Sequence, residues 1–373
     1  MTYIHELKDW PNFKWDSEAL TKPLAEVWQR QGKLIGQMEG LGFQLRSEAI
    51  LETLTEDVLK SSDIEGEVLD KDQVRSSIAR RLGMDAGAVA PSDRNVEGVV
   101  EMMLDATQNY NKPLTEDRLF GWHASLFPTG RSGMSKITVG GWRDDKLGPM
   151  QVVSKVYTNN PKIHYEAPQA GKLDTEMKAF LKWFETTDNT DLIIRAALAH
   201  LWFVTIHPFD DGNGRIARAI ADMALARSEK SKQRFYSMSA QIRLERNDYY
   251  AILESTQKAG LDVTPWLSWF LGCLNRAFDG AETILANVLA KAEFWREHAQ
   301  AEINNRQRDI INRLLDGFTG KLTSSKYALI EKCSADTALR DINELLEAGI
   351  LKKDDSGGRS TSYSLASDIK RQE

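Results

Sequence analysis

Apolar residues recur at steps of three and four along most of the chain, which is the period of an amphipathic α-helix. The period runs from Ser17 to about Thr107 and returns from Asp191 to Ile206 and from Arg215 to Arg227. Strand character is confined to residues 150–154 and 162–165, which flank turn-forming residues and predict a β-hairpin. The sequence therefore predicts a mainly α fold that carries one hairpin.

Breaks in this period predict four segments. We expect an N-terminal helical unit, a central catalytic core, a linker helix and a C-terminal domain, at residues 1–110, 111–290, 291–304 and 305–373. The last segment combines three short helices with two strands around the turn Ser356-Gly357-Gly358, which is the pattern of a winged helix.

Composition limits where the protein works and what it binds. The net charge of −6 provides no overall field for nucleic acid or an anionic membrane, and two cysteines without a CxxC motif are typical of a reducing compartment. The first residues are charged where a secretory signal needs an apolar core. The most apolar stretch, Trp266–Leu274, is about half the roughly 20 residues that a membrane span requires. We therefore expect a cytoplasmic protein with no membrane partner.

The segment from His207 to Arg218 reads HPFDDGNGRIAR and suits a polyphosphate. Gly212 and Gly214 let the backbone approach an anion where a helix begins, and the first amides of that helix favour phosphate. Arg215 and Arg218 are three residues apart, so they share a helix face and can bind neighbouring phosphates.

Three further side chains complete this predicted site. Asp211 supplies the hard oxygen that Mg²⁺ prefers, and Asn213 can donate to a phosphate oxygen. His207 can accept a proton from an attacking hydroxyl, because the pKa of histidine ordinarily lies near neutral pH. Phe209 is expected to anchor the loop in the core, and the chain contains no Walker A motif.

These residues resemble the signature HPFx[DE]GNGRxxR of the Fic family at every position. The resemblance implies transfer of AMP from ATP and Mg²⁺ onto a Tyr, Ser or Thr hydroxyl of a target protein, or of the protein itself. It makes His207 the general base and Asp211 the Mg²⁺ ligand. The Gly212-Asn213-Gly214 turn would hold phosphate, with Arg215 near the β-phosphate and Arg218 near the γ-phosphate.

The resemblance covers the chain from about Thr115 to Leu274 and implies further contacts. Residues 150–168 match the family's flap, a hairpin that docks the target segment as an added strand, although Lys155 stands where many relatives have glycine. The residues assigned to the nucleotide on this resemblance alone are Val153, Ser154, Tyr249 and Gln257.

Ser61, Glu65 and Gly66 fill the fixed positions of the family's inhibitory motif, [ST]xxxE[GN]. Without the resemblance, Gly66 would be read as a helix cap and Glu65 as a solvated acid. The resemblance implies that Glu65 pairs with Arg218 and so occupies the guanidinium that the γ-phosphate needs. We therefore expect a slow enzyme that is inhibited in cis.

Two alternatives stay open. The same motif serves removal of AMP, and in some relatives transfer of UMP or phosphocholine; Gly214 stands where kinase members carry lysine and favours attack at the α-phosphate. The other alternative is a DNA-binding regulator whose reading helix, Asp336–Leu346, offers Arg340 and Asn343 among several acids. Because phosphate contacts dominate DNA affinity, such a nearly neutral module is a poor DNA binder, and a protein-interaction or homodimer module is the competing interpretation.

Overall fold

The structure is a computed structural model that describes residues 2–84, 91–146, 148–154, 162–318, 320–354 and 361–366. The chain divides into two compact units, Met1–Ala281 and Glu282–Glu373. The described residues form fourteen α-helices and three two-stranded antiparallel sheets, which confirms the predicted mainly α fold. Among these residues, no helix is both long enough and apolar enough to span a membrane.

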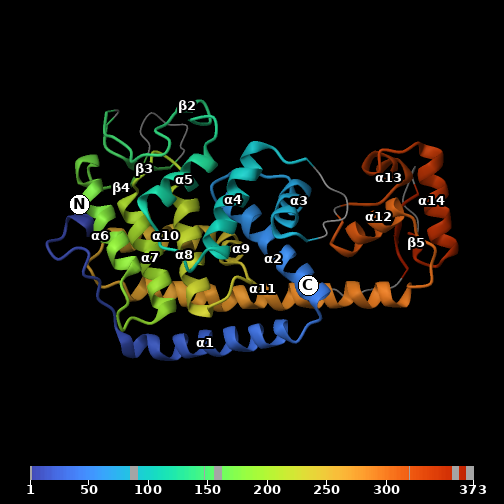
Figure 1. Cartoon of the computed structure of the whole chain (residues 1–373), viewed down its shortest axis with the longest axis horizontal. Helices are drawn as coiled ribbons and strands as arrows, with labels where there is room; N and C mark the ends of the chain where they lie inside the picture. Colours follow the sequence, from blue (N-terminus) through green and yellow to red (C-terminus); the bar gives the residue numbers. More distant parts are fainter. Residues whose placement is uncertain are drawn as a thin grey trace. The chain divides into compact units, whose positions relative to one another are not determined.

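The first unit is built around helices that Figure 1 labels in chain order. Its helices are α1 (Ser17–Glu39), α2 (Phe43–Ile64), α3 (Lys71–Leu82), α4 (Arg94–Gln108), α5 (Glu116–Leu126), α6 (Leu173–Glu185), α7 (Leu192–Ile206), α8 (Asn213–Glu229), α9 (Met238–Leu244) and α10 (Arg246–Gln257). The long helix α11 (Thr264–Glu297) begins in this unit and continues into the second.

Helix α7 is the centre of the first unit. It is apolar on every face, and its residues from Ile193 to Ile206 are all buried, as expected for a helix without a polar side. Asp191 begins it by accepting hydrogen bonds from the amides of Ile193 and Ile194, which satisfies two donors of the first turn. Helix α8 packs along α7, so the loop between them is fixed at both ends.

The predicted boundary at residue 110 does not separate compact units. Helix α2 packs against α9, and α4 packs against α8, so the apolar faces of the N-terminal helices are covered by the core. Residues 1–110 therefore belong to the same unit as the motif residues. The sequence could not show this, because an apolar helix face does not identify the element that covers it.

The predicted hairpin is present as β3 (Gln151–Val153) and β4 (Ile163–Glu166), which pair antiparallel with Val152 opposite Tyr165. Tyr165 anchors β4, since its buried hydroxyl donates to the Thr205 carbonyl at 2.7 Å. Lys155 and the expected turn lie outside the described residues. A second short hairpin, β1 (Arg131–Ser132) with β2 (Ser135–Lys136), was not predicted.

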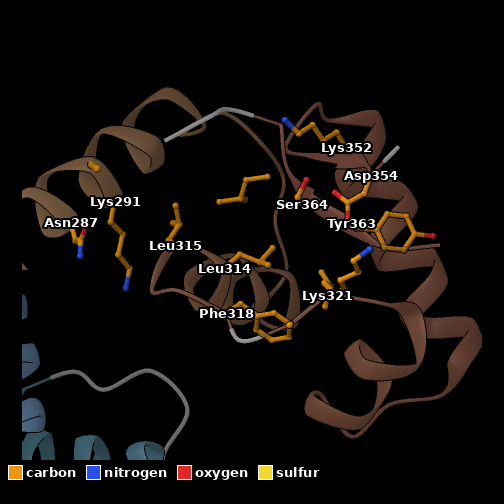
Figure 2. A pocket seen from close by; sticks show the side chains of 14 residues that line it. Asn287, Lys291, Leu314, Leu315, Phe318, Lys321, Lys352, Asp354, Tyr363 and Ser364 are labelled. Carbon is orange, nitrogen blue, oxygen red and sulfur yellow. The ribbon is translucent and has the colours of Figure 1, made fainter. Parts of the chain in front are cut away.

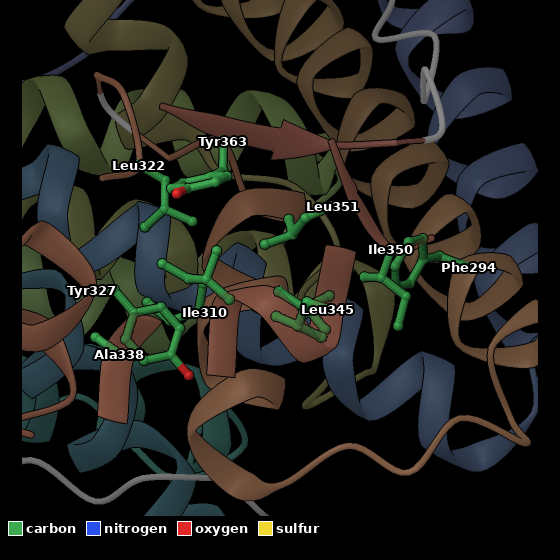
Figure 3. Close-up of a cluster of buried hydrophobic side chains, with 11 residues drawn as sticks. Phe294, Ile310, Leu322, Tyr327, Ala338, Leu345, Ile350, Leu351 and Tyr363 are labelled. Carbon is green, nitrogen blue, oxygen red and sulfur yellow. The ribbon is translucent and has the colours of Figure 1, made fainter. Parts of the chain in front are cut away.

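The second unit contains the predicted order of three helices followed by two strands. These are α12 (Asn305–Leu315), α13 (Ser324–Ile330), α14 (Ala335–Glu347), β5 (Leu351–Lys353) and β6 (Tyr363–Leu365). The glycine turn at 356–358 lies outside the described residues. The core of this unit, drawn in Figure 3, consists of Phe294, Ile310, Ile311, Leu322, Tyr327, Ala338, Ile342, Leu345, Ile350, Leu351 and Tyr363.

The predicted linker helix at 291–304 is instead the last part of α11, which ends at Glu297. Phe294 of that helix is buried in the core of the second unit, so the unit begins before residue 305. Figure 2 shows a pocket in this unit that is lined by apolar side chains, among them Leu314 and Phe318, and by basic ones, among them Lys321 and Lys352. None of the predicted site residues lines it.

Candidate nucleotide site

The motif loop joins the end of α7 to the start of α8. His207 ends α7 in the left-handed conformation, with φ 51°, and its amide donates to the Phe203 carbonyl at 3.0 Å. Gly212 has φ 81°, and a Cβ there would lie 2.9 Å from the ring of Phe127. Glycine is therefore required at Gly212 by both its backbone conformation and the space around it.

Asn213 and Phe209 hold this loop in shape. The Asn213 amide accepts from the Phe209 N–H at 3.0 Å and donates to the Phe209 carbonyl at 2.8 Å, and the Asn213 side chain is buried. The Phe209 ring is fully buried and stacks on His123 at 4.2 Å, in the core position predicted for it. The side chain of Asn213 thus shapes the loop, and its expected role as a phosphate donor stays a prediction.

Arg143 is a buried residue of the site that the sequence did not indicate. Its Nε donates to the His207 carbonyl at 2.8 Å, and its backbone amide donates to the Pro208 carbonyl at 2.9 Å. Its Nη2 donates to the Pro168 carbonyl at 2.5 Å, so one guanidinium joins the motif loop to the segment after β4. An arginine outside any motif gives no sequence signal of such a role.

The His207 ring is oriented for proton acceptance. Its Nδ1 lies 3.1 Å from the Val204 carbonyl, which can only accept, so Nδ1 carries the proton and Nε2 of the neutral ring keeps its lone pair. Burial lowers the pKa of His207, so the ring is neutral at neutral pH. Burial also lowers the pKa of His123 to about 4 and that of His200 to about 3, which leaves both rings neutral.

Asp211 offers a carboxylate at the mouth of the loop. The Ser132 hydroxyl donates to one of its oxygens, and the other accepts from the Gly212 amide at 2.6 Å. A carboxylate oxygen is a hard ligand of the kind that Mg²⁺ prefers. No cluster of three or more His, Cys, Asp or Glu able to hold a metal occurs in the part of the chain that the structure describes. An ion bound at Asp211 would therefore take its other ligands from phosphate and water.

The end of α2 reaches Arg218, which is buried. Ser61 accepts from Arg218 twice, through its carbonyl at 2.7 Å and its hydroxyl at 3.0 Å. Glu65 Oε1 lies 2.8 Å from Arg218 Nη1. Burial lowers the pKa of Arg218, but Glu65, Tyr249 and Tyr250 together outweigh this effect and raise that pKa above its ordinary value. A Cβ on Gly214 would lie 2.2 Å from Glu65 Oε1, so this glycine admits the carboxylate.

Two more arginines contact the same end of α2. Arg243 Nε lies 2.7 Å from Asp63, and Arg246 Nε donates to the Ile64 carbonyl at 2.7 Å. The ring of Tyr250 lies beneath the Arg246 guanidinium, 5.3 Å away. These contacts join α2 to α9 and α10 and were not indicated by the sequence.

Residues assigned by resemblance alone lie in two places. Tyr249 and Gln257 are buried: the Tyr249 hydroxyl lies 2.9 Å from His200 Nε2, and Gln257 donates to the Thr205 hydroxyl at 3.3 Å. Tyr250 is the exposed member of the tyrosine pair. Val153 and Ser154 lie on the flap, where Val153 is exposed and the Ser154 amide donates to the Lys162 carbonyl at 3.1 Å.

The exposed face of α14, the helix predicted to read DNA, carries more acidic than basic side chains. It presents Arg340, but also the carboxylates of Asp336, Glu344 and Glu347. Asp341 is buried and forms an ion pair with Arg306, whose Nε lies 2.7 Å from its carboxylate. It therefore belongs to the interior of the second unit and not to this exposed face. This face is unfavourable for DNA, because acids outnumber the cation that would contact phosphate.

Two protein families match the chain. The Fic/DOC family matches residues 113–225, and a domain of unknown function, DUF4172, matches residues 3–84. A protein adenylyltransferase Fic from Nematostella vectensis is 33% identical over 114 residues, which are 30% of this chain and 25% of that protein. A uridine 5'-monophosphate transferase from Xanthomonas campestris is 34% identical over 123 residues, which are 31% of this chain and 21% of that protein. The match thus spans about a quarter of these relatives or less.

Solved structures share the fold over more of the chain. A Fic family protein from Desulfovibrio desulfuricans matches with a TM-score of 0.51 at 21% identity, over 94% of this chain and 96% of that one. A Fic domain containing signaling protein from Bacteroides thetaiotaomicron matches with a TM-score of 0.52 at 21% identity, over 70% of this chain and 96% of that one. These likenesses establish a common fold.

Proposed function

Because residues 113–225 match the Fic/DOC family, we propose that the protein is a cytoplasmic nucleotidyltransferase that moves AMP from ATP to a Tyr, Ser or Thr hydroxyl of a protein. The observation that supports this most is the His207 ring, whose Nδ1–H is bound to the Val204 carbonyl while Nε2 keeps its lone pair. A base in this state, next to Asp211 and two arginines on one helix, suits attack of a hydroxyl on a phosphate.

The reaction we propose has one covalent step. The target hydroxyl oxygen attacks the α-phosphorus, its bond to phosphorus forms, and the bond to the β-phosphate oxygen breaks. Pyrophosphate leaves, and the hydroxyl proton passes to His207 Nε2. Arg215 and Arg218 bind the departing β- and γ-phosphates, while Asp211 would hold Mg²⁺, which when bound neutralises phosphate charge.

The target segment is proposed to pair with the flap. Val153 and Ile163 lie opposite each other on β3 and β4, and both are 43% exposed. Exposed apolar side chains on a two-stranded edge suit an extended peptide that adds as a further strand. His164 Nδ1 lies 2.6 Å from Glu254 of α10, which ties the flap to the helical core.

We also propose that Glu65 inhibits the enzyme in cis. The Glu65 carboxylate and the γ-phosphate need the same guanidinium, and Arg218 is buried with two further bonds to Ser61. ATP that cannot reach Arg218 binds with its α-phosphate out of line with the attacking hydroxyl. The unmodified chain is therefore slow until this contact opens.

Labelled nucleotides test the reaction directly. The wild-type protein, Glu65→Gly and Glu65→Gly/His207→Ala are incubated with lysate proteins and ATP labelled at either the α- or the γ-phosphate. We expect a covalent adduct from the α-label alone, strongest with Glu65→Gly and lost with His207→Ala. Transfer of the γ-label would show a kinase instead.

Two further reactions test the alternatives. Parallel incubations with α-labelled UTP separate AMP transfer from UMP transfer, and release of AMP from a prelabelled target measures the reverse reaction.

A further inference from the structure

Three carboxylates at the end of α2 each contact a different arginine. Asp63 lies 2.7 Å from Arg243, Glu65 lies 2.8 Å from Arg218, and Glu67 lies 2.6 Å from Arg215. The first arginine belongs to α9, but the other two are the arginines of the motif loop helix. Both motif arginines are therefore paired with the α2 end.

The backbone fixes Glu67 in this position. The Glu67 amide donates to the Ser62 carbonyl and the Gly66 amide to the Asp63 carbonyl, both at 3.0 Å, and Gly66 has φ 84°. These two bonds and the left-handed glycine are a Schellman motif, which ends the helix and turns the chain back. Glu65 and Glu67, on either side of Gly66, thus both face the start of α8.

Arg215 is confined around this contact. The residue is only 6% exposed, its guanidinium lies 5.2 Å from the centre of the Phe127 ring, and its Nε is buried without a hydrogen-bond partner. The Glu67 side chain, by contrast, is 36% exposed. A phosphate that binds Arg215 must therefore displace the carboxylate, and the carboxylate can move into water.

We infer that Glu67 is a second inhibitory carboxylate, which competes with the β-phosphate for Arg215 and makes nucleotide affinity depend on the number of phosphates. This inference rests on the proposed nucleotide site and separates two roles within it. Glu65 opposes the γ-phosphate at Arg218, and Glu67 opposes the β-phosphate at Arg215. AMP meets neither carboxylate, ADP meets Glu67, and ATP meets both.

Binding of AMP, ADP and ATP to the full chain, measured by calorimetry with Mg²⁺ present, tests this assignment. Glu67→Gln keeps the shape of the side chain and removes its charge. We expect it to raise ADP affinity about fivefold, which corresponds to about 1 kcal/mol, while AMP affinity changes by less than about twofold. Because the side chain is partly exposed, the variant should fold, and a thermal unfolding curve checks this.

Asp63→Asn is the matched control, since it removes a charge from the same turn but faces Arg243. It should leave the ratio of ADP to AMP affinity within about twofold of wild type. An equal change of AMP and ADP affinity in Glu67→Gln, or the same ratio change in Asp63→Asn, would overturn the inference. Nucleotide binding without any protein adduct would contradict the proposed transfer reaction while the affinity ratio still decides the role of Glu67. Absence of all nucleotide binding would overturn both.

Discussion

The loop that carries His207 and the turn that carries Glu65 face each other but are held by different forces. The loop depends on Asn213 and Arg143, which are 2% and 3% exposed and bond to its backbone. The turn depends on ion pairs whose carboxylate side chains, at Glu65 and Glu67, are 33% and 36% exposed.

This difference separates a fixed part of the site from a releasable one. A buried hydrogen bond that loses its partner costs about 1–3 kcal/mol, whereas a partly exposed ion pair contributes about 1 kcal/mol or less. The loop that carries His207 therefore keeps its shape, while the Glu65 and Glu67 side chains can move aside at a smaller cost when another anion takes their place. We expect the β- and γ-phosphates of a bound nucleotide to replace these two carboxylates as partners of the motif arginines.

The largest expected effect is on the fixed side, at His207. In the Glu65→Gly background, His207→Ala should lower the rate of AMP transfer by about a thousandfold or more, because the attacking hydroxyl loses its base. ATP affinity should stay within about threefold, since the ring accepts a proton and does not hold the phosphates. Calorimetry and adduct formation are measured on the same preparation. A large loss of ATP binding would make His207 a structural residue and break the comparison.

The next effect concerns the shape of the loop. Asn213→Ala removes both bonds to Phe209 in a buried site, so the free energy of unfolding of the first unit should fall by about 2–3 kcal/mol. Transfer should fall as well, because His207 and the phosphate amides lose their relative placement. Thermal or urea unfolding gives the stability. Unchanged stability with reduced ATP affinity would instead give Asn213 the phosphate-donor role that the sequence suggested.

On the releasable side, Glu65→Gly should raise self-modification at least about tenfold at saturating ATP and Mg²⁺, an effect of about 1.4 kcal/mol on the barrier. Removing the carboxylate frees Arg218 for the γ-phosphate. Stability should change little, because Ser61 still bonds to Arg218 twice. Equal labelling rates for the two proteins would show that Glu65 does not inhibit, and Asp63→Asn serves as the control for charge loss near the turn.

Features that depend on residues close together in sequence could be predicted best. The motif loop and the helical period could be predicted because spacing along one or two turns decides both. The sequence did not predict the roles of Arg143, Ser132 and Glu67. Each of these residues contacts a partner that is distant in sequence, such as Arg215 for Glu67. The packing of α2 on α9, which places the chain before and after residue 110 in one compact unit, is likewise a long-range contact that spacing does not predict.

The smallest expected effect is in the pH dependence between pH 7 and 8. Burial holds the pKa of His207 below its ordinary value near 6.5, so at least about three quarters of the rings are already neutral at pH 7. The value of kcat/KM of Glu65→Gly should therefore rise by less than about 1.3-fold from pH 7 to 8, and it should fall only when pH approaches the lowered pKa of His207. Initial rates of adduct formation at saturating Mg²⁺ provide the profile. A rate that climbs about tenfold across that interval would mean that His207 is protonated at neutral pH, or that the target hydroxyl ionises without its help.

The position of the acidic limb tests the contact between the His207 loop and the turn that carries Glu65. Because the Glu65 carboxylate raises the pKa of His207, this limb should lie at slightly lower pH in Glu65→Gly than in the wild type.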